Sequence, residues 1–226
     1  MIQLRRLPCP GILERKYETW TEKYLARREE DPGKRPESRQ YAHPEIKDTL
    51  AAMSSGKCFY CESKLGEDEY EVDHHIEIAE DPGRAFDWNN LYLACNGCQN
   101  KLPGKTIAVV ECLDPCNLEV APADHLGFED EVIVPKNASP QGRRTIAKYK
   151  LGRGDLELKR IRQLKRFHAR LDEIRRSQIA DGGRRLTADE RARLRRFAAP
   201  EHSYSLMFQC YLTRRGLLDT PEPAGE

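Results

Sequence analysis

The chain has 226 residues, of which 38% are hydrophobic and 33% are charged, and its formal net charge at pH 7 is +1. This length allows one medium-sized domain, or a small catalytic module with helical extensions. No apolar run reaches the length of a membrane span, and the first residues lack the apolar core of a signal peptide, so we expect a cytoplasmic protein with no membrane partner. Eight cysteines in such a chain indicate metal binding before disulfides.

The charge is unevenly distributed along the chain. Residues 143–197 contain 19 Lys or Arg residues against 7 Asp or Glu, a local net charge of +12, so the remainder is acidic. A basic segment of this kind suits a polyanion such as nucleic acid. It equally suits a solvated, arginine-rich helical bundle that docks on a partner, and charge alone does not choose between the two.

The first elements in chain order are helical. Apolar residues recur at helical spacing over Pro10–Glu30, and Asp31-Pro32-Gly33 ends that helix. Residues 32–41 form a polar link. A second helix is predicted over His43–Ser54, with its apolar residues on one face.

The middle of the chain has β character. Residues 69–78 have β character, and the short apolar run Leu91-Tyr92-Leu93 leads into the second cysteine pair. Val109-Val110 and Val132-Ile133-Val134 are candidate short strands. The expected fold class is therefore α+β, with helices flanking a small core at both ends.

The C-terminal part returns to helix from Gln141 onward. An apolar stripe, expected to be core, recurs at helical spacing on a basic segment that Gly182-Gly183 interrupts. Thr187 and Glu190 form a capping box that starts another helix, and a last helix is expected over Ser203–Arg215. The stripe consists of Ile161, Leu164, Phe167, Leu171 and Ile174.

We divide the chain into four parts on this pattern. Residues 1–56 form an N-terminal helical extension and residues 57–135 a core with two cysteine knuckles. Residues 136–220 form a basic helical region, and residues 221–226 a disordered tail.

Two Cys-x-x-Cys pairs mark the core, Cys58–Cys61 and Cys95–Cys98. Two residues between thiolates let one tight turn aim both sulfurs at a single tetrahedral ion, and two such pairs complete a four-sulfur shell. The prediction is one structural Zn²⁺ held by Cys58, Cys61, Cys95 and Cys98. The 33 residues between the pairs leave room for a hairpin that carries chemistry.

The other four cysteines do not extend this pattern. Cys112 and Cys116 have a plausible ligand spacing and His125 follows them, but nothing else supports a second site. We expect Cys9, Cys112, Cys116 and Cys210 to be buried free thiols.

The sequence Asp73-His74-His75 lies between the knuckles. Hydrolysis of a phosphodiester needs a base for the attacking water and a divalent cation to neutralise developing charge. An Asp-His pair can supply both, because the carboxylate holds a hard cation and the imidazole accepts the proton. Neighbouring side chains on a regular strand face opposite ways, so Asp73 and His74 can share a cleft only where the strand ends or kinks.

The order of motifs resembles the HNH endonuclease family, which implies a small ββα-metal, treble-clef-like zinc core between the N- and C-terminal helices. The chain has Cys-x-x-Cys, Val-Asp-His, Trp-Asn-Asn-Leu, a second Cys-x-x-Cys and then Lys. The resemblance implies that Asp73 binds a catalytic Mg²⁺ or Mn²⁺, that His74 is the general base and that Asn90 braces the loop. Some members use the second of two adjacent histidines as the base, which keeps His75 as the alternative.

One position departs from the family pattern. The family usually places Asn or His directly after the last zinc cysteine as a further ligand of the catalytic ion, whereas this chain has Gln99 followed by Asn100. The remaining ligand is therefore Gln99, Asn100 or a bridging water. The substitution also favours an alternative, a zinc-binding nucleic-acid or protein adaptor that has lost catalysis.

The sequence on either side of the core resembles one particular group within the HNH family. Residues 41–62, Leu113-Asp114-Pro115, residues 124–128 and residues 144–146 are similar to the PtuB group of HNH proteins found with retrons and Septu antiphage systems. The resemblance implies an antiviral defence nuclease that cuts DNA and is controlled by an ATPase partner of the PtuA type. An RNA-directed nuclease toxin would use the same residues and differ only in its substrate.

Overall fold

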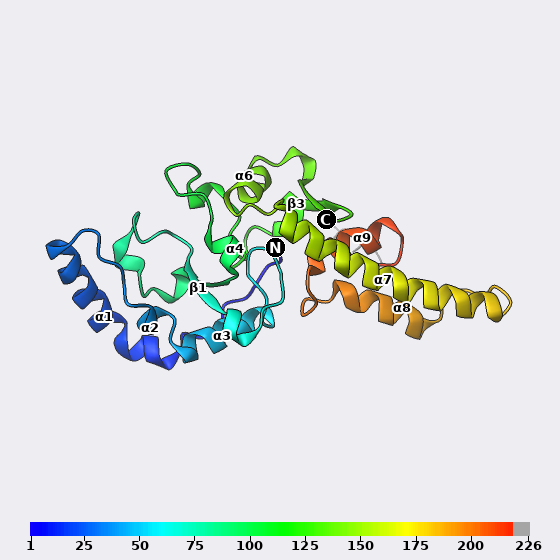
Figure 1. The fold of residues 1–226 in the computed structure, drawn as a ribbon, viewed down its shortest axis with the longest axis horizontal. Helices are drawn as coiled ribbons and strands as arrows, with labels where there is room; N and C mark the ends of the chain where they lie inside the picture. Colours follow the sequence, from blue (N-terminus) through cyan, green and yellow to red (C-terminus); the bar gives the residue numbers. More distant parts are fainter. Residues whose placement is uncertain (219–226) are drawn as a thin grey trace, which may run out of the picture.

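The computed structural model describes residues 1–218 and is a mixed α+β fold, mostly helical with two small hairpins. The expected α+β class is confirmed. Figure 1 shows an elongated molecule, with the first helix at one end and a pair of C-terminal helices projecting at the other. The hairpins and the cysteine knuckles lie between these two ends.

The N-terminal helices form where the sequence predicts them. Helix α1 spans Gly11–Glu30, the short α2 spans Ser38–Tyr41 within the predicted polar link, and α3 spans Pro44–Ser54. The His43 ring accepts a hydrogen bond from the Glu45 amide at the start of α3, and Pro44 occupies the first turn, where no intrahelical N–H partner is needed.

The first hairpin carries the predicted Asp-His sequence. Strand β1 (Glu71–His74) pairs antiparallel with β2 (Leu91–Ala94), with His74 opposite Leu91. Every residue of β2 is buried, and the short helix α4 (Asn96–Gln99) follows it directly. The result is a ββα unit in which strands of only four residues position the site.

Of the two candidate short strands after the knuckles, one lies in the second hairpin and the other does not form. After α5 (Pro122–His125), strand β3 (Leu126–Glu129) pairs antiparallel with β4 (Val132–Pro135), which includes the predicted run at 132–134. The expected strand at Val109-Val110 is wrong, because these residues begin a 3₁₀ helix, Val109–Glu111. No partner strand lies beside them in the described part of the chain, and Val110 is 81% exposed.

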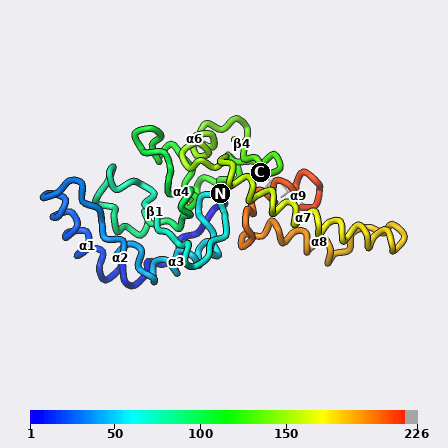
Figure 2. Tube along the Cα trace, viewed as in Figure 1, coloured from blue at the N-terminus to red at the C-terminus, as the bar shows by residue number. Residues whose placement is uncertain are grey.

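The C-terminal helices begin with α6 (Pro140–Lys148) and the 27-residue α7 (Gly154–Ala180). Gly182 and Gly183 end this helical segment, as the sequence predicts, and both adopt positive φ where the chain reverses. Helix α8 (Ala188–Arg195) starts at the predicted Thr187–Glu190 capping box, and α9 (Ser205–Arg214) is the last described helix. Figure 2 shows α7 leading away from the centre of the molecule and α8 returning alongside it. This pair of helices is called the arm below.

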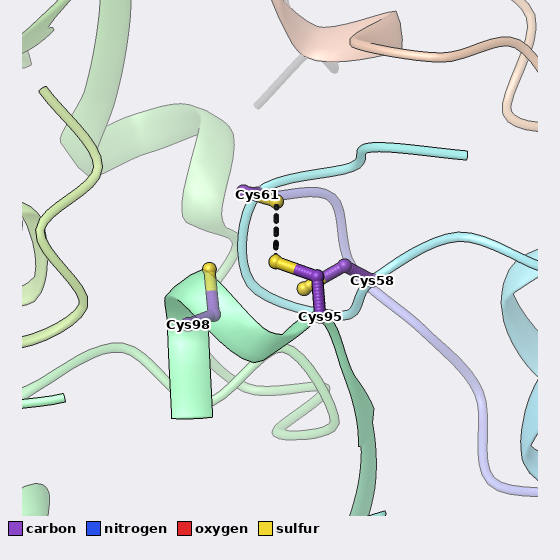
Figure 3. A group of neighbouring side chains, drawn as sticks. All are labelled: Cys58, Cys61, Cys95 and Cys98. Atoms are coloured by element: carbon purple, nitrogen blue, oxygen red, sulfur yellow. Dashed lines mark hydrogen bonds between the residues drawn. The ribbon is translucent and has the colours of Figure 1, made fainter. Parts of the chain in front are cut away.

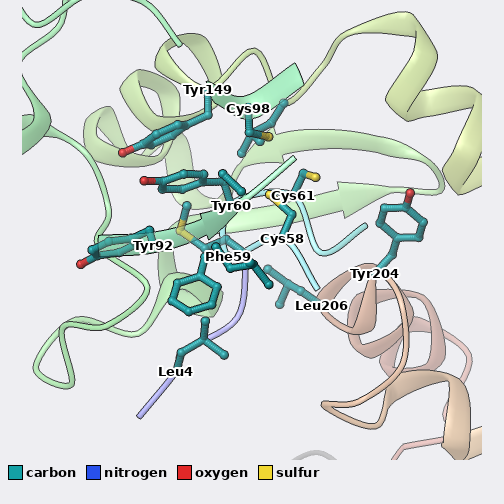
Figure 4. Packing of buried hydrophobic residues seen from close by; sticks show 14 of the residues in the cluster. Leu4, Cys58, Phe59, Tyr60, Cys61, Tyr92, Cys98, Tyr149, Tyr204 and Leu206 are labelled. Carbon is teal, nitrogen blue, oxygen red and sulfur yellow. The ribbon is translucent and has the colours of Figure 1, made fainter. Parts of the chain in front are cut away.

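The core is continuous from the hairpins into the base of the arm. Figure 4 shows the rings of Tyr149, Tyr60 and Tyr92 stacked beside the cysteine knuckles, with Tyr204 and Leu206 approaching from the C-terminal segment. Within α7, Phe167 is fully buried and Leu164 and Ile174 nearly so, which confirms most of the predicted stripe. Leu171 is only partly buried.

The expected disorder of residues 221–226 lies outside the described residues. Within residues 1–218, no helix combines the length and the apolar composition that crossing a bilayer requires.

Candidate active site

The four knuckle cysteines converge as predicted. Cys58 and Cys61 lie on the loop after α3, Cys95 follows β2 and Cys98 lies in α4, and their sulfurs are all within 4.8 Å of one another (Figure 3). The Cys61 and Cys95 sulfurs are 3.7 Å apart. A tetrahedral zinc with Zn–S bonds of about 2.3 Å needs sulfurs roughly 3.8 Å apart. The donor chemistry and the spacing therefore fit a structural zinc site.

The guanidinium of Arg153 lies against two sulfurs of this cluster. Arg153 directs Nη1 toward the Cys98 sulfur at 3.5 Å and Nη2 toward the Cys95 sulfur at 3.6 Å. Burial lowers the pKa of Arg153, but the nearby sulfurs of Cys98 and Cys61 raise it by more, so the net shift is upward. The guanidinium thus partly offsets the excess negative charge that four thiolates leave around a divalent ion. Gly97 permits this approach, since a Cβ there would come within 2.7 Å of the Arg153 guanidinium.

The other four cysteines stay outside any such cluster. Among residues 1–218, the knuckle cysteines are the only group of three or more His, Cys, Asp or Glu side chains with ligand atoms close enough for a metal. All four of the others are free thiols, as expected. Only Cys112 is buried, however, and Cys9, Cys116 and Cys210 are partly exposed.

A cleft of about 660 Å³ opens beside the first hairpin. One wall is formed by β1 and by the residues that follow Cys98. The other wall is formed by the end of α1, the link that follows it and the end of α2. The polar residues of the first wall are Asp73, His74, Glu77, Gln99, Asn100 and Lys101, and those of the second are Tyr24, Arg28, Lys34, Arg35 and Tyr41.

His74 is fixed in this cleft with a defined tautomer. Its Nε2 lies 2.8 Å from the Ala85 carbonyl oxygen, and because a carbonyl only accepts, Nε2 must carry the hydrogen. The basic lone pair of the neutral ring is then on Nδ1. The Tyr41 ring contacts the imidazole edge-on at 4.7 Å. Burial lowers the pKa of His74, although the hydrogen bond to Ala85 opposes that shift.

Asp73 lies in the same cleft because β1 ends at His74. Its Oδ2 accepts hydrogen bonds from the Tyr60 hydroxyl at 2.8 Å and from Lys101 Nζ at 2.6 Å. The same ammonium donates to the His74 carbonyl at 2.6 Å. Lys101 is the lysine that ends the HNH-like order of motifs, but sequence analysis assigned it no function. Its contact with Asp73 spans 28 residues, so no local sequence signal marks it.

His75 points into a different environment from its neighbour. Its ring stacks on Tyr92 at 4.4 Å, and its Nδ1 lies 3.3 Å from the Tyr149 hydroxyl and 3.4 Å from that of Tyr60. Burial lowers the pKa of His75 to about 3. The ring is therefore a neutral member of the aromatic core, and it does not line the cleft that holds Asp73 and His74.

Asn90 and Gln99 contribute in different ways. The buried Asn90 side chain accepts from the Ile76 amide at 2.6 Å and donates to the carbonyls of Ile76 and Arg84, at 3.0 and 3.1 Å. It thus ties together both ends of the loop that follows β1. Gln99 lines the cleft, and its Nε2 makes only a long contact of 3.5 Å with the Val72 carbonyl.

Comparison with known families agrees with this geometry. Residues 58–103 match the family model described as HNH endonuclease, an interval that runs from the first knuckle cysteine to just beyond Lys101. The chain contains an HNH endonuclease domain. The HNH domain thus supplies the four knuckle cysteines and one wall of the cleft, whereas the other wall comes from residues that precede it.

The chain is also homologous to Septu protein PtuB. It is 30% identical to Septu protein PtuB of Bacillus mycoides (strain KBAB4) over 174 residues, which is 63% of this chain and 57% of that protein. It is 32% identical to Septu protein PtuB of Bacillus thuringiensis over 103 residues, 45% of this chain and 37% of that protein. The chain therefore spans about half the length, or less, of these relatives.

Proposed function

We propose that this protein is a metal-dependent endonuclease that hydrolyses DNA phosphodiesters. The observation that carries the proposal is the placement of His74 and Asp73 in one cleft of an HNH domain, beside a zinc-type cluster that fixes the hairpin. A fixed imidazole and a carboxylate side by side are the groups that hydrolysis of a phosphodiester requires.

The cleft residues fit a hard divalent cation. Asp73 receives both of its hydrogen bonds from described residues at Oδ2, which leaves Oδ1 for an ion, and the amides of Gln99 and Asn100 offer further oxygen ligands. Carboxylate and amide oxygens are the donors that Mg²⁺ and Mn²⁺ prefer. When bound, the ion would neutralise charge on the phosphate and the leaving oxygen.

The chain's own side chains supply the general base, the support of the loop and additional positive charge. His74 accepts the proton of the attacking water at Nδ1, because Nε2 is occupied by Ala85. Asn90 keeps the loop that carries the Ala85 carbonyl in place. Lys101 holds Asp73 and adds positive charge beside the phosphate.

The similarity to PtuB proteins supports an antiphage setting. We propose that the nuclease acts with an ATPase of the PtuA type, and that the basic arm contacts either nucleic acid or this partner. Proteins of this composition with no apolar span are expected in the cytoplasm.

A catalytically inactive adaptor is the second candidate, and one contact favours it. Lys101 already places a positive charge 2.6 Å from Asp73, and the ion pair is almost fully buried. An adaptor of this kind would bind nucleic acid and retain its zinc without metal-dependent cutting. An RNA-directed nuclease would retain the same residues and cut RNA instead.

The test is a cleavage assay with supercoiled plasmid DNA and with tRNA, in Mg²⁺ or Mn²⁺, with and without an ATPase of the PtuA type. We expect DNA nicking that falls at least about a hundredfold in His74→Ala, the loss typical of a missing general base. His168→Ala, which removes a histidine of α7 outside the cleft, serves as the matched control. Nicking by His74→Ala at the wild-type rate contradicts the assignment of the base, and cleavage of tRNA alone supports the RNA nuclease.

A further inference from the structure

The second wall of the cleft comes from outside the HNH domain. Residues 32–36 and Tyr41 face β1 across the cavity, although they precede the HNH match by at least 17 residues. The link is held rather than loose: the Tyr24 hydroxyl donates to the Lys34 carbonyl at 3.3 Å, and the Lys34 amide donates to the Asp31 carbonyl at 2.9 Å. Pro36 is buried at its end.

The acidic groups of the cleft are already paired with cations that do not belong to the opposite wall. Asp73 is paired with Lys101 at 2.6 Å, and Glu77 with Lys148 at 3.2 Å. Neither carboxylate is therefore available to neutralise positive charge on the opposite wall.

The opposite wall carries three cations, and Arg28 among them donates to the Ile78 carbonyl at 3.1 Å. Lys34 and Arg35 are exposed, they line the cleft, and neither side chain forms an ion pair or hydrogen bond with the rest of residues 1–218. By contrast Arg27 and Arg39, on the adjoining helices, are both paired with Glu37 and do not line the cleft. Unpaired charge thus remains on the wall that faces His74.

We propose that Lys34 and Arg35 form a phosphate-binding subsite, which holds backbone phosphates next to the one that His74 attacks. This inference rests on the proposed function and extends it to the mode of substrate binding. A strand lying in the cleft would have Asp73 and His74 on one side of its backbone and this pair on the other. Lysine and arginine contacts to phosphates position a strand without reading its sequence, so substrate would be bound with little sequence preference.

The test measures binding and cleavage in matched double variants. Lys34→Ala/Arg35→Ala removes the proposed subsite, and Arg27→Ala/Arg39→Ala removes the same charge from outside the cleft. Binding of fluorescent single-stranded and duplex DNA is measured over a range of NaCl concentrations, with His74→Ala added to both so that nothing is cut. Zinc content and melting temperature establish that each variant is folded.

We expect Lys34→Ala/Arg35→Ala to weaken binding at low salt on the order of tenfold, and to reduce the slope of log K against log salt by roughly 1.4 to 1.8, the value for two lost phosphate contacts. With His74 intact, this double variant should raise KM for cleavage and leave kcat nearly unchanged. The Arg27→Ala/Arg39→Ala control should change both the affinity and the slope little.

Two results overturn the inference while leaving the proposed function in place. One is unchanged binding by Lys34→Ala/Arg35→Ala, and the other is an equal loss in both double variants, which would reflect overall charge. A wild-type protein that neither binds nor cuts nucleic acid would instead contradict the proposed function itself.

Discussion

The HNH domain and the arm are stabilised in opposite ways. The domain buries polar groups and pairs each of them: Asp73, His75 and Asn90 are all less than a tenth exposed and have partners within hydrogen-bond distance. The arm buries apolar side chains along one face of α7, around Phe167, and leaves most of its charged residues in solvent.

This difference follows from the size of the elements. Strands of four residues cannot bury enough apolar area to offset the entropy of ordering the loops between them, so a small domain of this kind needs cross-links or a metal. A 27-residue helix can instead lay a long apolar stripe on its neighbours. The domain gains a rigid polar site in this way, whereas the arm gains a large charged surface.

The segment that contains α9 packs against Phe167 of the arm and also contacts the HNH domain at the first knuckle. Glu62, next to the knuckle cysteine Cys61, accepts a hydrogen bond from the Ser205 hydroxyl at 2.5 Å, and Ser63 shares a hydrogen bond of 3.0 Å with the Tyr204 hydroxyl. The buried Lys57 ammonium donates to the His202 carbonyl at 3.0 Å. The comparison therefore predicts that damage to the knuckle reaches the base of the arm, while damage within the arm leaves the knuckle intact.

The largest effect is expected from loss of zinc. Structural zinc sites contribute about 10 to 16 kcal/mol of apparent folding free energy, more than the whole stability of a typical domain. Cys58→Ser should therefore lose its zinc and the cooperative unfolding of the HNH domain, as followed by metal analysis and thermal melting. Cys9→Ser is the control outside the cluster. A Cys58→Ser protein that melts like wild type without zinc would contradict the zinc assignment.

An intermediate effect is expected from the core of the arm. Phe167 is fully buried against Phe197, Phe208 and Tyr211, so Phe167→Ala should cost about 3 to 5 kcal/mol. Hydrogen exchange should speed up in α7 and α8 while zinc content stays at one per chain. Leu158→Ala, which truncates an exposed residue of the same helix, should have little effect. Zinc loss in Phe167→Ala would show that the two regions unfold as one unit.

The smallest effect is expected at the surface of the arm. Arg184 binds both carboxylate oxygens of Glu190 at 2.8 Å, and this contact, with the Thr187 amide, lowers the pKa of Glu190 to about 2. Because the folded pKa is below the ordinary value of 4.5, the pair stabilises the arm above pH 4.5 and is lost as the pH falls to about 2. Arg184→Gln should thus lower the melting temperature slightly at pH 7. The difference from wild type should shrink steadily between pH 4.5 and pH 2, and a difference that stays constant over that range would rule out the ion pair as its source.

Much of this architecture was predictable from local patterns. The helix over 10–30, the capping box at Thr187 and the helix break at Gly182-Gly183 depend on residues within one or two turns of each other, and all three are confirmed. The expected strand at Val109-Val110 failed for the complementary reason. β propensity specifies a strand only when a partner lies beside it, and the sequence does not say where partners lie.

The sequence by itself determined the cysteine knuckles and the residues of the HNH motif, because a fixed spacing in the chain is enough to bring two thiols to one ion and to place an Asp next to a His. Only the tertiary structure decided which neighbour faces the cleft, His74 rather than His75, because that depends on where β1 ends and on which aromatic rings surround it. It also decided that Lys101 meets Asp73 and that residues 32–36 close the cleft. Those contacts join segments tens of residues apart, and they form only when burial of the core brings the segments together.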